Sequence, residues 1–306
     1  MTEPESLEAL RPLLLSIAYR MLGAVHDAED IVQEAMLRYH REAGSGTEIR
    51  SSKAYLSAVV TRLAIDHLRS ARAQRETYVG EWIPEPVLTD GGANDALASA
   101  ELSESVSLAF LLLLERLSPV ERAVFLLHDV FAFGYDEIAE IVGKSEANCR
   151  QLALRARRHI EAGKTRFEAS RQARDELASR FFGAVVNGDV KGLIDTLAAD
   201  VVVHGDGGGK APQWATPIAG AERVARLLAG VGRQIGDRAG RLELREVNGQ
   251  PGALVLAPNG QLISVFALDI RDGAVHAIRS IVNPDKLRHL GPVADVYALL
   301  RSQHEH

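Results

Sequence analysis

The sequence of 306 residues contains a single cysteine, Cys149, so no disulfide can form within the chain. Long apolar runs are also missing: the longest, Leu108–Leu114, is far shorter than the roughly 18 residues of a membrane-spanning helix. The first ten residues, MTEPESLEAL, are acidic and lack the basic region of a signal peptide. These absences favour a cytoplasmic protein of a reducing compartment, with no contact with the membrane.

The remaining composition is that of a globular protein, with 46% hydrophobic and 25% charged residues, and the length suggests two or three domains. A net charge of −6 is unusual for a nucleic-acid-binding chain. The charge is uneven, however, because residues 144–174 hold nine Lys and Arg against three Glu. Phosphate contacts need local positive charge only, so this stretch predicts weak DNA binding that a partner protein would strengthen.

Residues 135–161 predict two short helices around a tight turn at Gly143, with Ser145 as the N-cap of the second. The second helix has one apolar face, formed by Cys149, Leu152, Ala153, Ala156 and Ile160. Its separate polar face carries Asn148, Gln151, Arg155 and Arg158. Because Asn, Gln and Arg make paired hydrogen bonds to base edges in the major groove, a DNA-reading helix-turn-helix is the first hypothesis. The alternative is a helical hairpin with a merely basic surface.

Two amphipathic helices are predicted near the N-terminus. Residues 27–41 combine an apolar stripe with a polar face of Asp27, Asp30, Gln33 and Glu34. Residues 52–76 combine an apolar face with a polar face that includes Arg62, Asp66, Arg69 and Arg72. Each polar face has a plain alternative interpretation, since acidic and basic helix faces are commonly just solvated or salt-bridged.

Residues 79–98 contain two prolines and two adjacent glycines and predict a linker. From about residue 170 the pattern changes to helices at 172–187 and 189–198, followed by short β-rich runs bounded by turn residues. The predicted strands are Val201–His204, Leu242–Val247, Ala253–Leu256, Leu262–Ile270 and Ala274–Val282. This pattern predicts an α+β domain with a mostly antiparallel sheet.

The order DAEDIVQEA, RLAIDHLR and LSPVERAVFLLHDVFAFGYDEIAEIVGKSEANCRQLALRARR resembles the extracytoplasmic-function sigma factors of the sigma-70 family over about residues 8–165. The resemblance implies binding of core RNA polymerase, through its β′ clamp helices and β subunit, and of promoter DNA. It implies that the polymerase contacts are Asp27, Asp30, Ile31, Val32, Gln33 and Glu34, and that the −10 element contacts are Arg62, Asp66, His67, Arg69 and Arg72. The implied −35 contacts are Lys144, Ser145, Glu146, Asn148, Arg150, Gln151, Arg155 and Arg158. Thr61-Arg62 departs from the Arg-Asn pair common in the family.

The tail resembles SnoaL-like polyketide cyclases, in which helices pack on a curved sheet to form a cone. Sigma factors with such a tail share three motifs, matched here by a tryptophan–proline segment, a glycine segment and an asparagine–proline segment. Their implied regulatory residues are Trp82, Pro84, Glu85, Pro86, Asp206, Gly207, Gly208, Gly209, Lys210, Asn283, Pro284, Asp285 and Lys286. The resulting prediction is a multi-domain chain of two all-α sigma domains, a helical bundle and a helix-turn-helix, followed by an α+β SnoaL-like cone domain that regulates them in cis.

The predicted boundaries are 1–78 for the domain that binds polymerase and the −10 element, 79–98 for the linker, 99–168 for the −35-binding domain, and 169–306 for the regulatory domain. No cofactor, metal or catalytic residue is expected. Small-ligand binding in the tail stays open, as does catalysis by His204, Asp206, Asp269 or His276. The glycine segment fails the P-loop spacing. The main alternative function is a one-component regulator that binds an effector and an operator.

Overall fold

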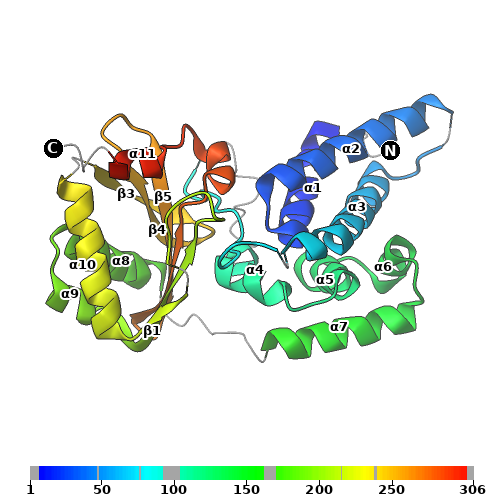
Figure 1. Cartoon of the computed structure of the whole chain (residues 1–306). Coiled ribbons are helices and arrows are strands. Elements are labelled where there is room, and N and C mark those ends of the chain that lie inside the picture. Colours follow the sequence, from blue (N-terminus) through cyan, green and yellow to red (C-terminus); the bar gives the residue numbers. More distant parts are fainter. Residues whose placement is uncertain are drawn as a thin grey trace. The chain divides into compact units, whose positions relative to one another are not determined.

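The computed structural model describes residues 7–46, 48–75, 77–91, 104–161, 170–214, 216–237 and 240–301 (Figure 1). The chain divides into two compact units. The first consists of Met1–Glu76 and Ala93–Lys164, and the second of Thr77–Gly92 and Thr165–His306. The chain therefore enters the second unit at Thr77, returns to the first, and enters the second again after the helix-turn-helix.

The first half of the first unit is a bundle of three helices. They are α1 (Leu7–Leu22), α2 (Val25–Gly44) and α3 (Ser52–Arg75), and α1 packs against both of the others. Leu14, Val32, Leu56 and Val60 are fully buried between them. The apolar stripe predicted for α2 is confirmed, because Ala28, Ile31, Val32 and Ala35 are buried whereas Met36 and Tyr39 are half-buried.

The second half of the first unit is also helical. It comprises η2 (Glu104–Val106), α4 (Leu108–Leu114), α5 (Pro119–Phe125), the π-helical turn η3 (Leu126–Val130), α6 (Tyr135–Val142) and α7 (Glu146–Glu161). Ser118 and Glu121 form a reciprocal capping box that starts α5. Gly143 ends α6 in the left-handed conformation, with φ of 67°, and the Ser145 hydroxyl accepts a hydrogen bond from the Asn148 N–H. The predicted helix-turn-helix is confirmed.

The second unit is built on a six-stranded sheet in the order β2-β1-β6-β5-β4-β3. Its strands are β1 (Leu197–Asp206), β2 (Ile218–Ala219), β3 (Arg241–Val247), β4 (Gln250–Leu256), β5 (Leu262–Arg271) and β6 (Ala274–Ile281). All neighbouring pairs are antiparallel except β1 and β6, which run parallel with Val203 opposite Ile278. The mostly antiparallel sheet of the sequence prediction is confirmed.

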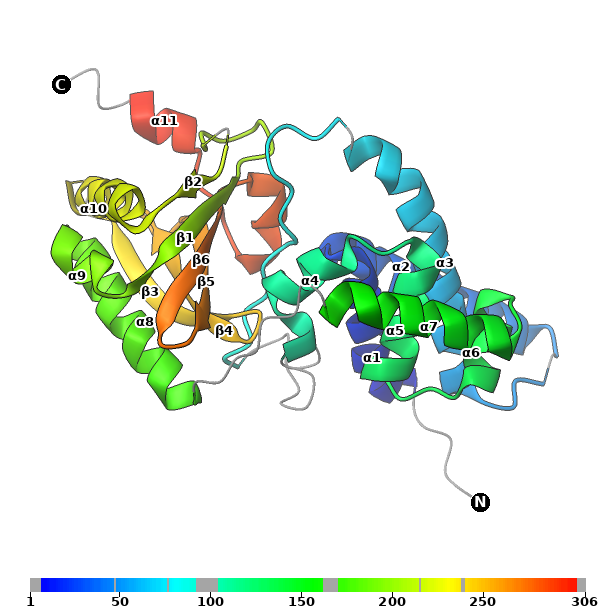
Figure 2. The ribbon, with the colours of Figure 1, turned by 90° about the horizontal axis from the view of Figure 1, so that it is seen from below.

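Three helices cover one face of this sheet: α8 (Arg171–Val186), α9 (Val190–Ile194) and α10 (Ala221–Asp237) (Figures 1 and 2). The core lies between these helices and the sheet, where Phe181, Leu228, Val203 and Ile278 are almost fully buried. One predicted boundary is wrong: the helix expected at 189–198 ends at Ile194, and the chain then enters β1 at Leu197. The remaining short helices are η4 (Pro284–Lys286), η5 (Arg288–Leu290) and α11 (Val296–Arg301).

Residues 77–91, which we call the strap, run without a helix across the second unit. The Thr89 N–H donates to the Glu246 carbonyl (2.9 Å), and the Asn248 N–H donates to the Val87 carbonyl (2.8 Å). Leu88 also forms an isolated antiparallel bridge with Val247, so this end of the strap continues the sheet beyond β3. Residues 92–98 of the predicted linker lie outside the described residues.

Candidate functional site

Asp206, at the end of β1, is the centre of the polar contacts that hold the strap. Its side chain is fully buried. The Tyr78 hydroxyl donates to Oδ1 (2.5 Å), while the Ile83 N–H (2.9 Å) and the Lys286 ammonium (2.6 Å) donate to Oδ2. Charge-assisted hydrogen bonds of this kind are the strong ones, and three of them compensate the carboxylate for its removal from water.

Lys286, in the short helix η4 that follows the neighbouring strand β6, completes the site. Its ammonium also donates to the Ile83 carbonyl (2.5 Å), so one lysine binds both Asp206 and the strap backbone. The same nitrogen lies 4.4 Å from the centre of the Trp82 ring and 4.9 Å from that of Tyr78. These distances allow cation–π attraction, which strengthens where the cation is desolvated. Lys286 therefore holds the strap by hydrogen bonds from its ammonium and by cation–π contacts with two aromatic rings of the strap.

The turn that carries Lys286 is itself attached to Asp206 and Tyr78. The backbone N–H groups of Val282 and Asn283 donate to the Asp206 carbonyl (2.9 and 3.1 Å). The Asn283 amide donates to the Tyr78 hydroxyl (2.9 Å), and its oxygen accepts from the Asp285 N–H (3.1 Å). The asparagine thus starts the short helix η4 and holds the strap at the same time.

The glycines after Asp206 are required by close contacts. A Cβ atom on Gly207 would lie 2.4 Å from the Ala211 carbonyl, and one on Gly208 would lie 2.2 Å from the Asn283 amide. Gly208 and Gly209 also have positive φ angles of 57° and 70°, which glycine adopts without strain. Lys210, which follows them, pairs with Asp285 at the surface. The glycine segment is therefore a tight turn against the strap.

The far end of the strap has separate attachments that use Asn248, His289 and Asp90. The Val87 N–H donates to Asn248 Oδ1 (3.0 Å), and His289 Nε2 donates to the Pro86 carbonyl (2.7 Å). Partial burial acts to raise the pKa of Asp90, but two hydrogen bonds from Arg245 (2.6 and 2.7 Å) and one from the Glu246 N–H (3.0 Å) outweigh it and lower the pKa.

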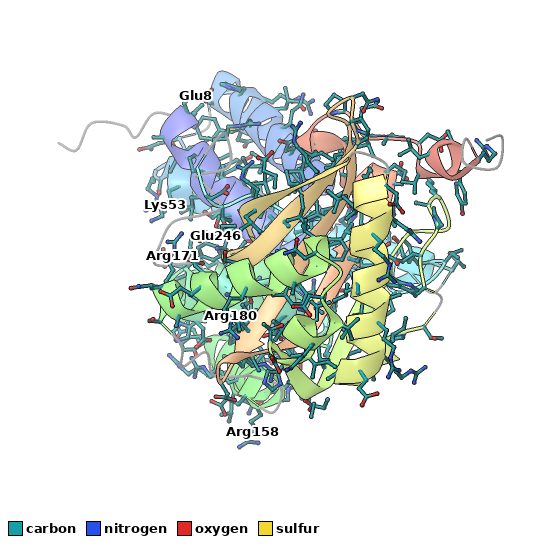
Figure 3. The ribbon with its side chains drawn as sticks, turned by 90° about the vertical axis from the view of Figure 1, so that its left-hand side faces the viewer. Glu8, Lys53, Arg158, Arg171, Arg180 and Glu246 are labelled. Carbon is teal, nitrogen blue, oxygen red and sulfur yellow. The ribbon has the colours of Figure 1, made fainter. Side chains whose placement is uncertain are left out.

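Glu246 on β3 links the strap to α8. Its carboxylate accepts from the Thr89 hydroxyl (2.8 Å) and from Arg171 (2.5 Å), at the start of α8 (Figure 3).

The structure thus brings the three predicted motifs together: Trp82, Asp206, the glycines, Asn283 and Lys286 form one cluster. Pro84 and Pro86 are buried in the strap between them. Tyr78, Asn248 and His289 were not predicted, because nothing in their local sequence marks them. His204 and Asp206 were also candidate catalytic residues, but Asp206 is fully bound by the strap and Lys286, and His204 Nδ1 lies 3.0 Å from Glu81 Oε1 of the strap.

In the first unit, the predicted polymerase-binding residues of α2 divide by burial. Val32 and Ile31 are 0% and 8% exposed and belong to the core of the bundle. Asp30 and Gln33 are exposed, and Asp27 and Glu34 are partly exposed on the opposite side. Asp27 pairs with His67 of α3 (3.3 Å), so a residue of the predicted polymerase set contacts one of the predicted −10 set.

On α3, Arg62 contacts the helix-turn-helix. Its guanidinium donates to the carbonyls of Ile141 (2.9 Å) and Glu140 (2.8 Å) at the end of α6. A cation there is stabilised by the partial negative charge of the helix C-terminus. Asp66 pairs instead with Arg69 on its own helix (3.1 Å). The side chain of Arg72 lies outside the described residues.

The predicted −35 residues all lie on the exposed side of the turn and of α7, and Cys149, Leu152 and Ala153 face the core as predicted. Burial raises the pKa of the Cys149 thiol, which suits a core residue. Arg150 pairs with Glu146 (2.7 Å) and lies over the Tyr135 ring (5.2 Å). Arg155 lies 3.3 Å from Glu121.

Comparison with known proteins places these helices in a family. The family model described as Sigma-70 region 2 matches residues 7–74, and the one described as Sigma-70, region 4 matches residues 107–160. The ECF RNA polymerase sigma factor SigJ of Mycobacterium tuberculosis is 41% identical over 292 residues, which cover 93% of each chain. This chain belongs to the ECF RNA polymerase sigma factors. The match spans the tail as well as the helical regions, so it is a sigma factor with a C-terminal α+β domain.

Two further similarities agree with that assignment. The probable ECF sigma factor SigI of M. tuberculosis is 34% identical, over 91% of this chain and 92% of that relative. The crystal structure of the M. tuberculosis extracytoplasmic function sigma factor SigJ superimposes with a TM-score of 0.75 and 38% identity, and covers 95% of this sigma factor and all of that chain. Among the described residues, no helix is long and apolar enough to span a membrane.

Proposed function

We propose that this sigma factor binds core RNA polymerase through the polar side of α2, reads the −10 element through α3 and the −35 element through α7, and is regulated by the attachment of its strap to the C-terminal domain. Family membership carries the general role. The residue assignments rest on which side chains are exposed: Asp30, Gln33, Asn148 and Gln151 all lie on the solvent side of their helices.

The contact of Arg62 with α6 supports a resting arrangement that must change before transcription. The −10 and −35 elements are, by their names, centred about 25 base pairs apart, which is on the order of 80 Å of duplex at about 3.4 Å per base pair. Two readers joined by hydrogen bonds of 2.8 and 2.9 Å cannot occupy both elements at once. We therefore expect the Arg62 contact to break when the sigma factor binds its promoter.

The buried Asp206 carboxylate is the observation that carries the regulatory part of the proposal. Residues 76–103 connect α3 to η2, and 15 of these 28 residues, 77–91, form the strap. The contacts of the strap fix the path of about half of this connection. A free chain of the same length could extend by up to about 3.5 Å per residue. Release of the strap would give the two DNA readers more freedom to separate. The C-terminal domain can therefore govern their placement.

In vitro transcription with core polymerase tests the proposal, with a cognate promoter selected from a random library. Three proteins are compared: the full-length chain, a chain truncated after Lys164, and full-length Asp206→Asn. We expect both changes to alter transcript yield several-fold in the same direction, since both free the strap. Equal yields from all three would refute regulation through the strap. Promoter binding without core polymerase at the affinity of the holoenzyme would instead favour a one-component regulator.

A further inference from the structure

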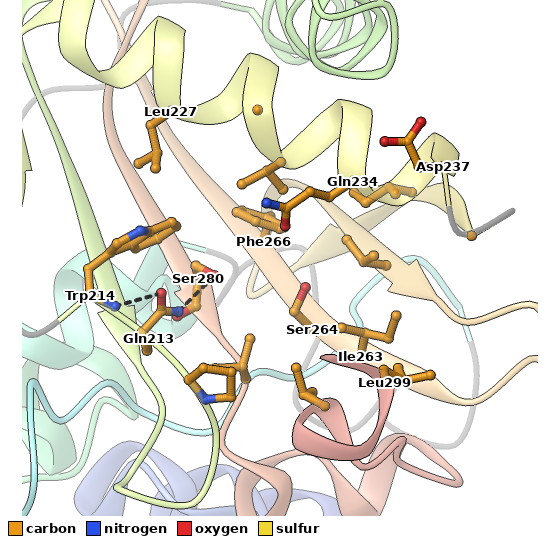
Figure 4. A pocket seen from close by; sticks show the side chains of 18 of the residues that line it. Gln213, Trp214, Leu227, Gln234, Asp237, Ile263, Ser264, Phe266, Ser280 and Leu299 are labelled. Atoms are coloured by element: carbon orange, nitrogen blue, oxygen red, sulfur yellow. Dashed lines mark hydrogen bonds between the residues drawn. The ribbon is translucent and has the colours of Figure 1, made fainter. Parts of the chain in front are cut away.

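The C-terminal domain contains a cavity of about 880 Å³ on the face of the sheet that α10 covers (Figure 4). Its volume falls within the roughly 300–1,000 Å³ of small-molecule sites. Apolar side chains form most of the wall. They come from α10, from the sheet and from α11, and include Leu227, Val231, Ile235, Phe266, Val296 and Leu299.

The polar groups of the wall are few and differ by position. Gln213, Gln234, Ser264 and Ser280 supply amide and hydroxyl groups (Figure 4). The charged lining residues, Arg226 and Asp237, are exposed on α10, and Arg226 pairs with Glu222 (2.8 Å) with 67% of its side chain in solvent. An ionised group deep in the cavity would thus lose its water without gaining a counter-charge, at a large free-energy cost. The wall therefore favours a neutral occupant.

The cavity shares two chain segments with the strap site. In the first, Asp206 holds the strap, and Pro212, Gln213 and Trp214 line the cavity. A Cβ atom on Gly205, next to Asp206, would come within 2.5 Å of the Gln213 side chain, so these two parts of the segment are in tight contact.

The second shared segment follows β6. Ser280 and Val282 line the cavity, and Asn283 and Lys286 hold the strap. The Gln213 amide joins the two segments by donating to the Ser280 carbonyl (3.2 Å) and hydroxyl (3.1 Å). A molecule in the cavity would contact both segments that position Asp206 and Lys286.

We propose that this cavity binds a neutral, mainly apolar small molecule with a few hydrogen-bonding groups, and that the strap senses its presence through residues 206–214 and 280–286. The second part rests on the proposed regulatory function of the strap. Its physical basis is linkage: a ligand that fixes the segments carrying Asp206 and Lys286 stabilises the attached strap relative to the released one.

Binding is tested on the full-length chain with two probes of the same ring skeleton. The neutral probe is N-phenyl-1-naphthylamine, and the charged one is 8-anilinonaphthalene-1-sulfonate; the emission of each rises in an apolar site. We expect saturable binding of the neutral probe, about tenfold tighter than that of the sulfonate, because the sulfonate would have to shed its water. Equal or tighter binding of the sulfonate would overturn the assignment of a neutral ligand.

Two matched variants of α10 locate the probe. Gly230 lines the cavity, and a Cβ atom there has nothing nearer than Arg233 Nη2 at 4.0 Å; Gly236 has open space but is not part of the wall. Gly230→Phe should weaken binding of the neutral probe by about tenfold or more, and Gly230→Leu should weaken it by less. Gly236→Phe should weaken binding by no more than about twofold. Glycine replacement favours the helix, so loss of folding is not expected. Unchanged binding to Gly230→Phe would overturn the site.

Residue-level amide hydrogen exchange tests the link to the strap. The Ile83 N–H donates to Asp206, whereas the Thr89 N–H donates to Glu246 on β3, whose residues do not line the cavity. Saturating neutral probe should slow exchange at Ile83 by about threefold or more and leave Thr89 unchanged. No change, or equal slowing of both amides, would overturn the coupling. These measurements need no polymerase, so their failure is distinct from failure of the proposed transcription role.

Discussion

Lys286 and Asp206 form an ion pair of 2.6 Å with side chains that are 7% and 0% exposed. The carboxylate has further donors in Tyr78 and Ile83, and the ammonium has a further acceptor in the Ile83 carbonyl. A buried pair of this kind contributes little compared with well-packed apolar residues, but removal of one partner leaves an uncompensated charge. The pair therefore makes attachment of the strap sensitive to single changes.

Lys286→Met keeps most of the side-chain length and removes the charge. We expect it to lower the free energy of unfolding of the C-terminal domain by about 3–5 kcal/mol, because Asp206 stays buried without its cation. Lys210→Met is the matched control, since Lys210 pairs with Asp285 at the surface, and it should cost no more than about 1 kcal/mol. Urea unfolding measures both. Adding Asp206→Asn to Lys286→Met should restore part of the loss, and strict additivity would contradict this account.

Tyr78 predicts a loss of strap attachment at alkaline pH. Burial, and then its hydrogen bond to Asp206, raise the pKa of the Tyr78 hydroxyl well above its ordinary value. With the strap released, the hydroxyl titrates near the pKa of about 10 that is usual for a solvated tyrosine. Above that pH the released form loses a proton that the attached form keeps, so attachment of the strap weakens as pH rises. The contribution of the Tyr78 hydroxyl to attachment is fully present only below about pH 10.

Hydrogen exchange of the Ile83 amide between about pH 9 and 11 checks this expectation. Its rate is compared with the rate expected for the released strap at the same pH. In Tyr78→Phe the strap should be weaker at neutral pH, because Asp206 loses a donor, but its attachment should depend less on pH over that range. An equally steep alkaline loss in both proteins would contradict the assignment to Tyr78.

Arg62 predicts a link between −10 recognition and the resting arrangement of the first unit. Arg62→Ala removes two charge-assisted hydrogen bonds to α6, so the population with α3 and α6 apart should rise by about tenfold or more. Arg69→Ala is the control, because Arg69 pairs only within α3, with Asp66, among the contacts described. Energy transfer between dyes on Leu37→Cys and Leu154→Cys, both exposed positions, in a Cys149→Ala background measures the separation. Identical efficiencies in the two variants would exclude this role for Arg62.

On α7, Gln151 and Arg158 should contribute differently to DNA binding. Gln151 lies near the start of the helix, where recognition helices contact base edges, so Gln151→Ala should change the preferred base at one −35 position by about 1–3 kcal/mol. Arg158 is exposed two turns later on the same helix. Arg158→Ala should weaken binding of the holoenzyme to all promoters alike, and it should reduce the salt dependence of that binding by about one unit of slope. Competition binding with single-base promoter variants at several salt concentrations separates the two. The division fails if both variants alter every base preference equally.

Much of this fold was predictable because its signals are local. The stripe from Ala28 to Ala35 and the buried face of Cys149, Leu152 and Ala153 follow from helical periodicity, which depends on residues three or four apart. The end of the helix at Ile194 was not predicted, because the following residues read equally well as helix or strand. They become β1 because they pair with β6, which lies about 75 residues later in the chain.

The sequence alone determined the chemistry of this protein: a helix-turn-helix with Asn148 and Gln151 on its outer face, an acidic helix before it, and three motifs of unassigned geometry. Only the tertiary structure decided that Asp206 and Lys286 pair with each other and both bind the strap at Ile83, and that Arg62 binds the end of α6. These contacts join residues separated by about 80 or more positions, and no local pattern encodes a partner at that distance. Tyr78 shows the difference most clearly, since only the fold reveals that its hydroxyl reaches a carboxylate 128 residues away.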